Sequence, residues 1–193
     1  MPPHRIGLFG GTFDPVHRGH LLMATAAMEE ARLDRLFFIP AARSPFKESM
    51  KPSSGKDRVR WLRLALAGNP CFEIDERELK RGGVSYAIDT VNAYQRQYPD
   101  AQLCYLIGAD HLEKLHQWRD ATKLAEALEF LIVPRPGEPQ DAIPAPFKGT
   151  FLSGFPCSIA SSMIRERVRS GKSIGELVSS FVEQDIVNRG IYL

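Results

Sequence analysis

The chain has 193 residues, of which 44% are hydrophobic and 25% charged, and its formal net charge at pH 7 is +2. This composition is ordinary for a globular domain, and the near balance of charge argues against a dedicated nucleic-acid-binding or membrane-surface protein. No apolar run approaches the roughly 20 residues that span a bilayer, and the N-terminus lacks the apolar core of a signal peptide. Cys71, Cys104 and Cys157 are far apart and odd in number, so we expect buried free thiols in a cytoplasmic protein.

Short apolar segments alternate with segments of helical periodicity along the whole chain. A strand at 5–10 stops at a glycine turn and is followed by a helix at 19–33, a strand at 35–41 and a polar loop at 41–54. The pattern then predicts a helix at 56–68, a strand at 71–75, a helix at 85–98 with Ser85 as its N-cap, and a strand at 102–108. There follow helices at 109–118 and 122–130, a strand at 129–137, an irregular segment at 135–148 and a strand at 149–155. The chain closes with helices at 161–171 and 173–190, the latter with Ile174, Leu177, Val178, Phe181 and Val182 on one stripe.

The strands are continuously apolar, which indicates burial on both faces and hence a largely parallel sheet. We therefore expect an α/β fold: a Rossmann-like, doubly wound sheet with helices on both faces, in a single domain of residues 1–193. Ligands of such folds bind beyond the carboxyl ends of the strands, at the switch point. This places one cleft among residues 10–20, 40–47, 108–110, 134–135 and 154–162.

The turn after the first strand carries the residues of chemical interest. The stretch GLFGGTFDPVHRGH, residues 7–20, places glycines and then His17, Gly19 and His20 at the start of a helix. Such starts bind phosphate, because glycine lets backbone N–H groups approach an anion and the helix N-terminus adds positive potential. The G-x-G-x-x-G and P-loop patterns are both absent. Three interpretations of the two histidines remain: a structural pair, a metal pair, or a phosphate-binding pair, which fits the turn best.

The stretch GGTFDPVHRGH resembles the (T/H)-x-G-H signature of the nucleotidylyltransferase superfamily. More closely, the chain resembles the bacterial nicotinate mononucleotide adenylyltransferases, in the stretches SPFK (44–47), ELKRGGVSYAIDT (78–90), LIGADHLEKLHQW (106–118), VPRPG (133–137) and IASSMIR (159–165). The resemblance implies transfer of AMP from ATP to nicotinate mononucleotide by direct in-line attack, with release of pyrophosphate. Such a reaction needs no nucleophilic side chain, and neither a G-x-S-x-G elbow nor a cysteine beside a base suggests one.

For the ATP half of the site, the resemblance implies catalytic roles for His17, His20 and Arg165. It assigns ATP contacts to a set of turn and helix-start residues, namely Gly10, Gly11, Thr12, Phe13, Gly19, Gly108, Asp110, Ser161 and Ser162. By spacing alone, Asp110 and the two serines are equally helix caps, and Arg165 is equally a solvated charge. We expect Mg²⁺ to bind mainly through ATP phosphates, with no ligand from protein side chains.

For the acceptor half, the resemblance assigns mononucleotide binding to Lys47, Ser85, Tyr86, Trp118 and Arg135. Spacing alone makes Trp118 a core or rim aromatic residue, whereas the resemblance makes it a platform for the pyridine ring. Two positions depart from the family pattern. Phe46 stands where many members carry histidine, and Ala87 stands where many carry a hydroxyl residue.

Two alternatives stay open for the function. The first is an adenylyltransferase with another phosphorylated acceptor, such as nicotinamide mononucleotide or phosphopantetheine. The second is a non-catalytic nucleotide-binding regulator, although His17, His20 and Arg165 are all present. The expected partners are the small molecules ATP and nicotinate mononucleotide, and the sequence leaves a homo-oligomer possible.

Overall fold

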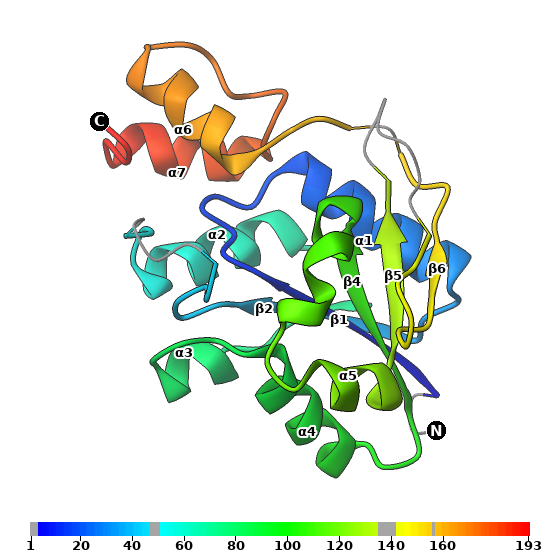
Figure 1. Ribbon diagram of the computed structural model, residues 1–193. Helices are drawn as coiled ribbons and strands as arrows, with labels where there is room; N and C mark the ends of the chain where they lie inside the picture. The colour runs from blue at the N-terminus through cyan, green and yellow to red at the C-terminus, as the bar shows by residue number, and fades with distance from the viewer. Residues whose placement is uncertain (1–3, 47–50, 135–141, 156) are drawn as a thin grey trace.

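Six parallel strands form one sheet in the order β3-β2-β1-β4-β5-β6 (Figure 1). The computed structural model describes residues 4–46, 51–134, 142–155 and 157–193. The strands are β1 (Arg5–Gly11), β2 (Arg35–Pro40), β3 (Phe72–Ile74), β4 (Gln102–Gly108), β5 (Glu129–Val133) and β6 (Gly149–Phe151). Every neighbouring pair is parallel, which confirms the predicted doubly wound α/β fold. The strand order reverses between β1 and β4, so the switch point lies at the carboxyl end of β1.

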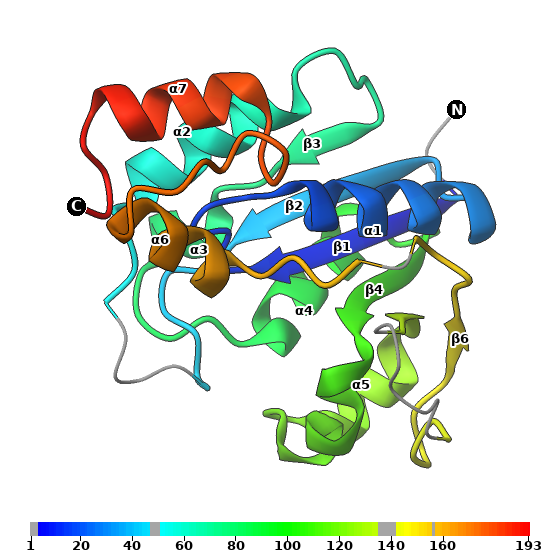
Figure 2. The same ribbon diagram turned by 90° about the horizontal axis from the view of Figure 1, so that it is seen from above.

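Helices cover both faces of the sheet (Figures 1 and 2). On one face lie α1 (Arg18–Glu30), α2 (Gly55–Leu66), α6 (Ser161–Arg169) and α7 (Ser180–Asn188). On the other lie α3 (Arg77–Arg81), α4 (Ala87–Gln97), the 3-10 helix η1 (Ala109–Gln117) and α5 (Ala121–Ala127). Seen from above in Figure 2, α1 runs along β1, and α6 lies beyond the end to which the β1 and β2 arrows point.

Each face of the sheet has its own hydrophobic core. Phe9 and Phe38 join the core under α1, α2, α6 and α7, whereas Ile6, Leu8 and Ile39 join the core under α4, η1 and α5. Successive side chains of a strand point to opposite faces, so continuously apolar strands bury residues in both layers. This is why the apolar runs in the sequence predicted helices on both faces.

The predicted helix over 173–190 is wrong in its first half. Ser179 has extended backbone angles and caps α7, which therefore begins only at Ser180. Ile174, Val178 and Val182 are buried as predicted, but Phe181 is 61% exposed. Helical spacing continued across Ser179 into α7 therefore predicts the burial of Val182 correctly but that of Phe181 wrongly.

Ser85 is not the N-cap of α4, because the cap residue is Tyr86. The Ser85 hydroxyl instead accepts the Ala42 N–H at 2.9 Å, which ties the start of α4 to the end of β2. The 109–118 segment forms a 3-10 rather than an α-helix, and β5 and β6 end before their predicted limits. The three cysteines are free thiols, but only Cys104 is buried.

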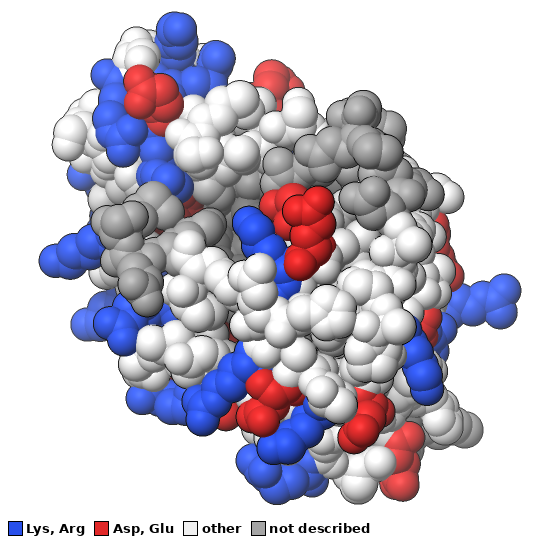
Figure 3. Space-filling model, in the orientation of Figure 1, with Lys and Arg blue, Asp and Glu red and all other residues white. Residues whose placement is uncertain are grey.

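In Figure 3, blue basic groups lie at the upper left, with red acidic atoms among them, and continue down the left edge, whereas both signs of charge mix along the lower edge. The helix α6 itself carries Arg165, Arg167 and Arg169. The α6 end of the molecule also carries the carboxyl ends of β1 and β2, so the local charge suits an anionic ligand. No helix in the described part of the chain is long and apolar enough to cross a membrane.

Candidate active site

The turn after β1 is shaped by close packing. A Cβ atom on Gly10 would lie only 2.2 Å from the Tyr105 hydroxyl oxygen, so this position accepts no side chain. Phe13 has φ of 51°, in the left-handed region that non-glycine residues rarely adopt, and its ring is buried against Phe9 and Phe38. Burial of this ring offsets the backbone strain and fixes the path of the turn toward α1. Phe13 therefore shapes the turn from inside the core.

His17 and His20 form a reciprocal cap at the start of α1. His17 Nδ1 accepts the His20 N–H at 3.3 Å, and His20 Nδ1 accepts the His17 N–H at 3.2 Å. Their rings stack with centroids 3.6 Å apart and planes 23° apart. Gly19 lies between them and is buried. The structure therefore brings the pair together as the spacing predicted, and it uses one nitrogen of each ring in the cap.

The cap decides which ring nitrogen can act on a ligand. A nitrogen that accepts an N–H carries no proton, so each neutral ring holds its proton on Nε2. Burial lowers the pKa of His17 to about 4, because the 6% exposed ring is poorly solvated. Two stacked cations would also repel each other. At neutral pH the neutral His17 thus presents an Nε2–H donor, which suits a phosphate oxygen.

The buried neutral His17 should make stability depend on pH. The unfolded chain takes up this proton near pH 6.5, whereas the native chain does so only near pH 4. The unfolded state therefore binds more protons between these values, and the free energy of unfolding should fall by about 2–3 kcal/mol between pH 7.5 and 4.5 from this source. Urea unfolding at both pH values measures the loss. Between these pH values, the free energy of unfolding of His17→Gln should fall by about 2–3 kcal/mol less than that of the wild type. The exposed His116→Gln should show the same fall as the wild type. Equal falls in the two variants would contradict the assignment.

Contacts from α6 hold the turn on its other side. The Ser161 hydroxyl donates to the Pro15 carbonyl at 2.9 Å, and Arg165 Nη1 donates to the Asp14 carbonyl at 2.7 Å. Ser161 is the first residue of α6 and Ser162 the second, after the cap residue Ala160. Neither is the N-cap, and only Ser162 is exposed. The structure thus places Arg165 and both serines beside the His17 turn, 140 or more residues away in the sequence.

Arg58 is a buried cation of this region that sequence reasoning missed. It is 2% exposed, and its guanidinium donates to the carbonyls of Ser53 at 3.0 Å and of Thr12 and Ala41, both at 2.8 Å. Burial lowers the pKa of Arg58, and the nearby Asp14 carboxylate opposes that shift. One side chain therefore joins the turn after β1, the end of β2 and the start of α2. Its only sequence signal was an arginine on the apolar side of a helix.

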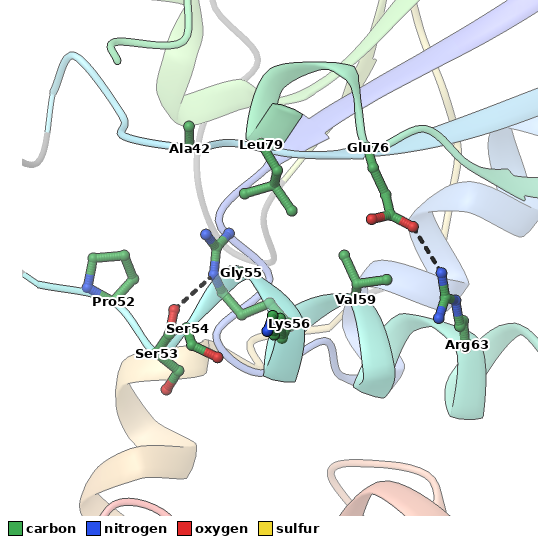
Figure 4. A pocket seen from close by; sticks show the side chains of 11 residues that line it. Ala42, Pro52, Ser53, Ser54, Gly55, Lys56, Val59, Arg63, Glu76 and Leu79 are labelled. Carbon is green, nitrogen blue, oxygen red and sulfur yellow. Dashed lines mark hydrogen bonds and ion pairs between the residues drawn. The ribbon is translucent and has the colours of Figure 1, made fainter. Parts of the chain in front are cut away.

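Arg58 lines a cavity of about 600 Å³ beside the start of α2, which Figure 4 shows from close by. The Arg58–Ser53 bond and an Arg63–Glu76 ion pair of 2.7 Å border this cavity. None of the predicted substrate-binding residues that the structure describes lines it. We therefore assign it no part in the reaction.

A second cavity, of about 460 Å³, is lined by the three predicted acceptor residues that the structure describes. Its lining contains Gly10, Gly11, Thr12, Ser85, Tyr86 and Trp118, with Phe46, His111 and Arg119 beside them. Residues assigned to the two substrates by resemblance thus meet in one space at the end of β1. This is the position that the switch-point rule predicts. The nearby Glu78 carboxylate is buried and accepts the Thr90 hydroxyl at 2.6 Å.

Aromatic rings form one wall of this cavity. Trp118 packs edge-on against Tyr105 at 5.7 Å and Phe130 at 6.1 Å, and its Nε1–H is buried without a hydrogen-bond partner. The half-exposed Phe46 ring lies 6.5 Å from Trp118, so the residue that departs from the family pattern adds to the aromatic wall. The Arg119 guanidinium lies 4.7 Å from the centre of the Tyr86 ring. It is the one Lys or Arg of this lining among the residues that the structure describes.

Of the remaining predicted residues, Gly108 and Asp110 are described by the structure and Lys47 and Arg135 are not. Gly108 ends β4 and is itself the cap residue of η1, so Asp110 is not the N-cap; it lies exposed in the first turn of η1. Lys47 and Arg135 lie outside the described residues. His111 and Arg119, which the sequence reasoning did not single out, are additional candidates from the lining.

The parallel sheet, the histidine pair at the start of α1 and the cavity at the switch point together define a nucleotidyltransferase. The model of the cytidylyltransferase-like family matches residues 8–167. A relative in Opitutus terrae, described as a probable nicotinate-nucleotide adenylyltransferase, is 41% identical over 90% of both chains. The nicotinate-nucleotide adenylyltransferase of Bacillus subtilis is 37% identical over 97% of this chain and 98% of the relative. The chain belongs to the cytidylyltransferase-like family, among its nicotinate-nucleotide adenylyltransferases.

Solved structures with this fold include the nicotinic acid mononucleotide adenylyltransferase of Plasmodium falciparum. Its complexes with NaAD and with APC superpose with TM-scores of 0.80 and 0.81, at 16% identity and over 98% of this chain and 97% of that chain. At this identity the likeness concerns the fold.

Proposed function

We propose that the protein transfers AMP from ATP to nicotinate mononucleotide, giving nicotinate adenine dinucleotide and pyrophosphate. The observation that carries the proposal is the His17–His20 pair, whose reciprocal cap uses both Nδ1 atoms and so puts the proton of each neutral ring on Nε2, in the helix start that follows the turn lining the aromatic cavity. The names of the relatives, which match this chain over 90% or more of its length, agree with it.

In the reaction, a phosphate oxygen of the mononucleotide attacks the α-phosphorus of ATP, and the bond to the bridging oxygen of pyrophosphate breaks. The attacking phosphate is already an anion at neutral pH and needs no general base. Catalysis therefore rests on positioning and on donors aimed at the charge that develops on the α-phosphate and the leaving group. We assign the first task to the cavity and the second to His17, His20 and Arg165, with Ser161 and Ser162 at the outer phosphates.

The pyridine ring of the acceptor fits between the aromatic wall and the start of α4. Trp118 and Phe46 offer apolar ring faces and edges, and Arg119 offers a positive charge. A cation in this lining favours a carboxylate over a neutral amide, and so supports nicotinate over nicotinamide.

Magnesium enters this proposal as part of the substrate, MgATP. No group of three or more His, Cys, Asp or Glu side chains among the described residues could hold a metal ion. The side chains at the ATP half are instead donors and cations, which suit phosphate oxygens. The metal would accordingly bind through phosphate and water, and neutralise the leaving pyrophosphate. We infer a cytoplasmic location from the free thiols and the use of ATP.

The deciding experiment is a parallel assay of pyrophosphate release from MgATP with three acceptors: nicotinate mononucleotide, nicotinamide mononucleotide and phosphopantetheine. We expect turnover with the first and at least tenfold lower kcat/KM with the second, because the amide lacks the charge that Arg119 attracts. A preference for nicotinamide mononucleotide would overturn the choice of acceptor. Absence of turnover with all three, together with retained ATP binding, would favour a nucleotide-binding regulator.

A further inference from the structure

The end of the chain lies against the turn that precedes α1. The Tyr192 hydroxyl donates to Asp14 Oδ1 at 2.7 Å, across 178 residues of sequence. Tyr192 is half-buried, and its ring lies 5.8 Å from the buried ring of Trp61 in α2. Its φ of 75° is in the left-handed region, which costs a tyrosine conformational energy. The surrounding contacts must therefore hold the residue in this conformation.

Asp14 connects the chain end to the ATP half of the site. Its side chain is 4% exposed; besides the Tyr192 bond, Oδ2 accepts the Ser53 N–H at 3.2 Å. Its backbone carbonyl accepts Arg165 Nη1 at 2.7 Å. Asp14 also lies three residues before His17. A movement of Asp14 would thus displace both the arginine and the histidine pair.

The position of Tyr192 is itself fixed by an ionic network between α7 and α2. Asp185, in α7, is buried and accepts Trp61 Nε1–H at 2.9 Å and Arg60 Nε–H at 2.7 Å. Arg189, three residues before Tyr192, binds Asp57 at 2.6 Å and Asp185 at 3.2 Å. These bonds involve partly or fully buried carboxylates, so they hold the last residues against α2 more firmly than exposed ion pairs would.

We propose that Tyr192 is a positioning residue for the ATP half of the active site, acting through its hydrogen bond to Asp14 on Arg165 and on the His17–His20 pair. This inference rests on the proposed function and adds to it a residue 175 positions beyond His17. The Tyr192 hydroxyl donates to Asp14, so we assign it an effect on the site through Asp14 and no contact with the reacting atoms. Its effect should fall on ATP and spare the acceptor, whose cavity is lined by other residues.

The test compares Tyr192→Phe with Tyr94→Phe. Both variants remove a hydroxyl that donates to an aspartate, since Tyr94 bonds Asp75 Oδ2 at 2.8 Å, but Tyr94 lines neither cavity and lies in α4. We expect Tyr192→Phe to weaken ATP binding by up to about tenfold and to lower kcat by up to about tenfold. The KM for nicotinate mononucleotide should stay within about twofold of the wild-type value. Tyr94→Phe should lower Tm by about as much as Tyr192→Phe does, and it should leave ATP binding unchanged. ATP binding is measured by calorimetry and turnover by pyrophosphate release.

A double-mutant cycle with Asp14→Ala isolates the bond, because alanine removes the acceptor of the Tyr192 hydroxyl. If Tyr192 acts through Asp14, the effects of Tyr192→Phe and Asp14→Ala on ATP binding should be less than additive in the double variant. Additive effects, or ATP binding by Tyr192→Phe equal to that of Tyr94→Phe, would overturn the inference and leave Tyr192 a purely structural residue. Lack of turnover by the wild type would refute the proposed function, whereas the ATP-binding comparison would still decide the role of Tyr192.

Discussion

Replacement of His20 by asparagine is expected to lower kcat about 10²- to 10³-fold with a change in Tm of only a few degrees. The side-chain oxygen of asparagine can occupy the place of Nδ1 and accept the His17 N–H, so the cap of α1 is kept. What asparagine lacks is a donor at the place of Nε2, where we expect the charge of the transferring phosphate to develop. The loss should therefore appear in turnover rather than in stability.

Two further variants sharpen this prediction. His20→Gln places its amide nitrogen near the position of Nε2 and should recover part of the lost turnover, while it weakens the cap. The exposed His116→Ala removes an imidazole outside the lining of the cavity and should retain wild-type kcat. Steady-state pyrophosphate release, normalised to folded protein, measures all three. If kcat of His20→Asn were within tenfold of the wild-type value, the catalytic role assigned to His20 would be wrong.

Replacement of Arg58 by methionine should destabilise the protein by about 3–5 kcal/mol, because it removes the buried guanidinium that donates to three backbone carbonyls. Methionine keeps the apolar stem, so the loss reports the guanidinium rather than a cavity. The Asp14 carboxylate would also lose its nearby cation, which would add to the loss. At this chain length we expect a fall in Tm of about 10 °C or more.

Arg63→Met is the matched control, since Arg63 lies on the same helix and borders the same cavity (Figure 4). Its side chain is 67% exposed and forms an ion pair with Glu76, so its loss should cost less than about 1 kcal/mol. Urea unfolding gives both free energies. Similar losses in the two variants would show that the bonds of Arg58 contribute little. Folded Arg58→Met should in addition turn over more slowly, because Thr12 lines the substrate cavity.

Sequence reasoning reached the fold because local patterns carry it. Continuous apolar strands between helical segments indicate a parallel sheet with two covering layers, and each strand was found at its predicted place. The errors came where a local pattern was extended too far. The stripe through Phe181 assumed that one helix continued across Ser179, and the N-cap role of Ser85 assumed that its hydroxyl had no partner outside its own segment.

By itself, the sequence determined the parallel α/β fold, the glycine turn after β1 and the pairing of His17 with His20, because local patterns of residues carry each of them. Only the tertiary structure decided which distant residues support that site. Arg58, Tyr192 and Arg119 have no motif, and their importance comes from the backbone carbonyls, the carboxylate and the ring that folding brings beside them. Buried polar groups need partners, but the partner of each is chosen by packing across the sheet, which no periodicity in the chain records.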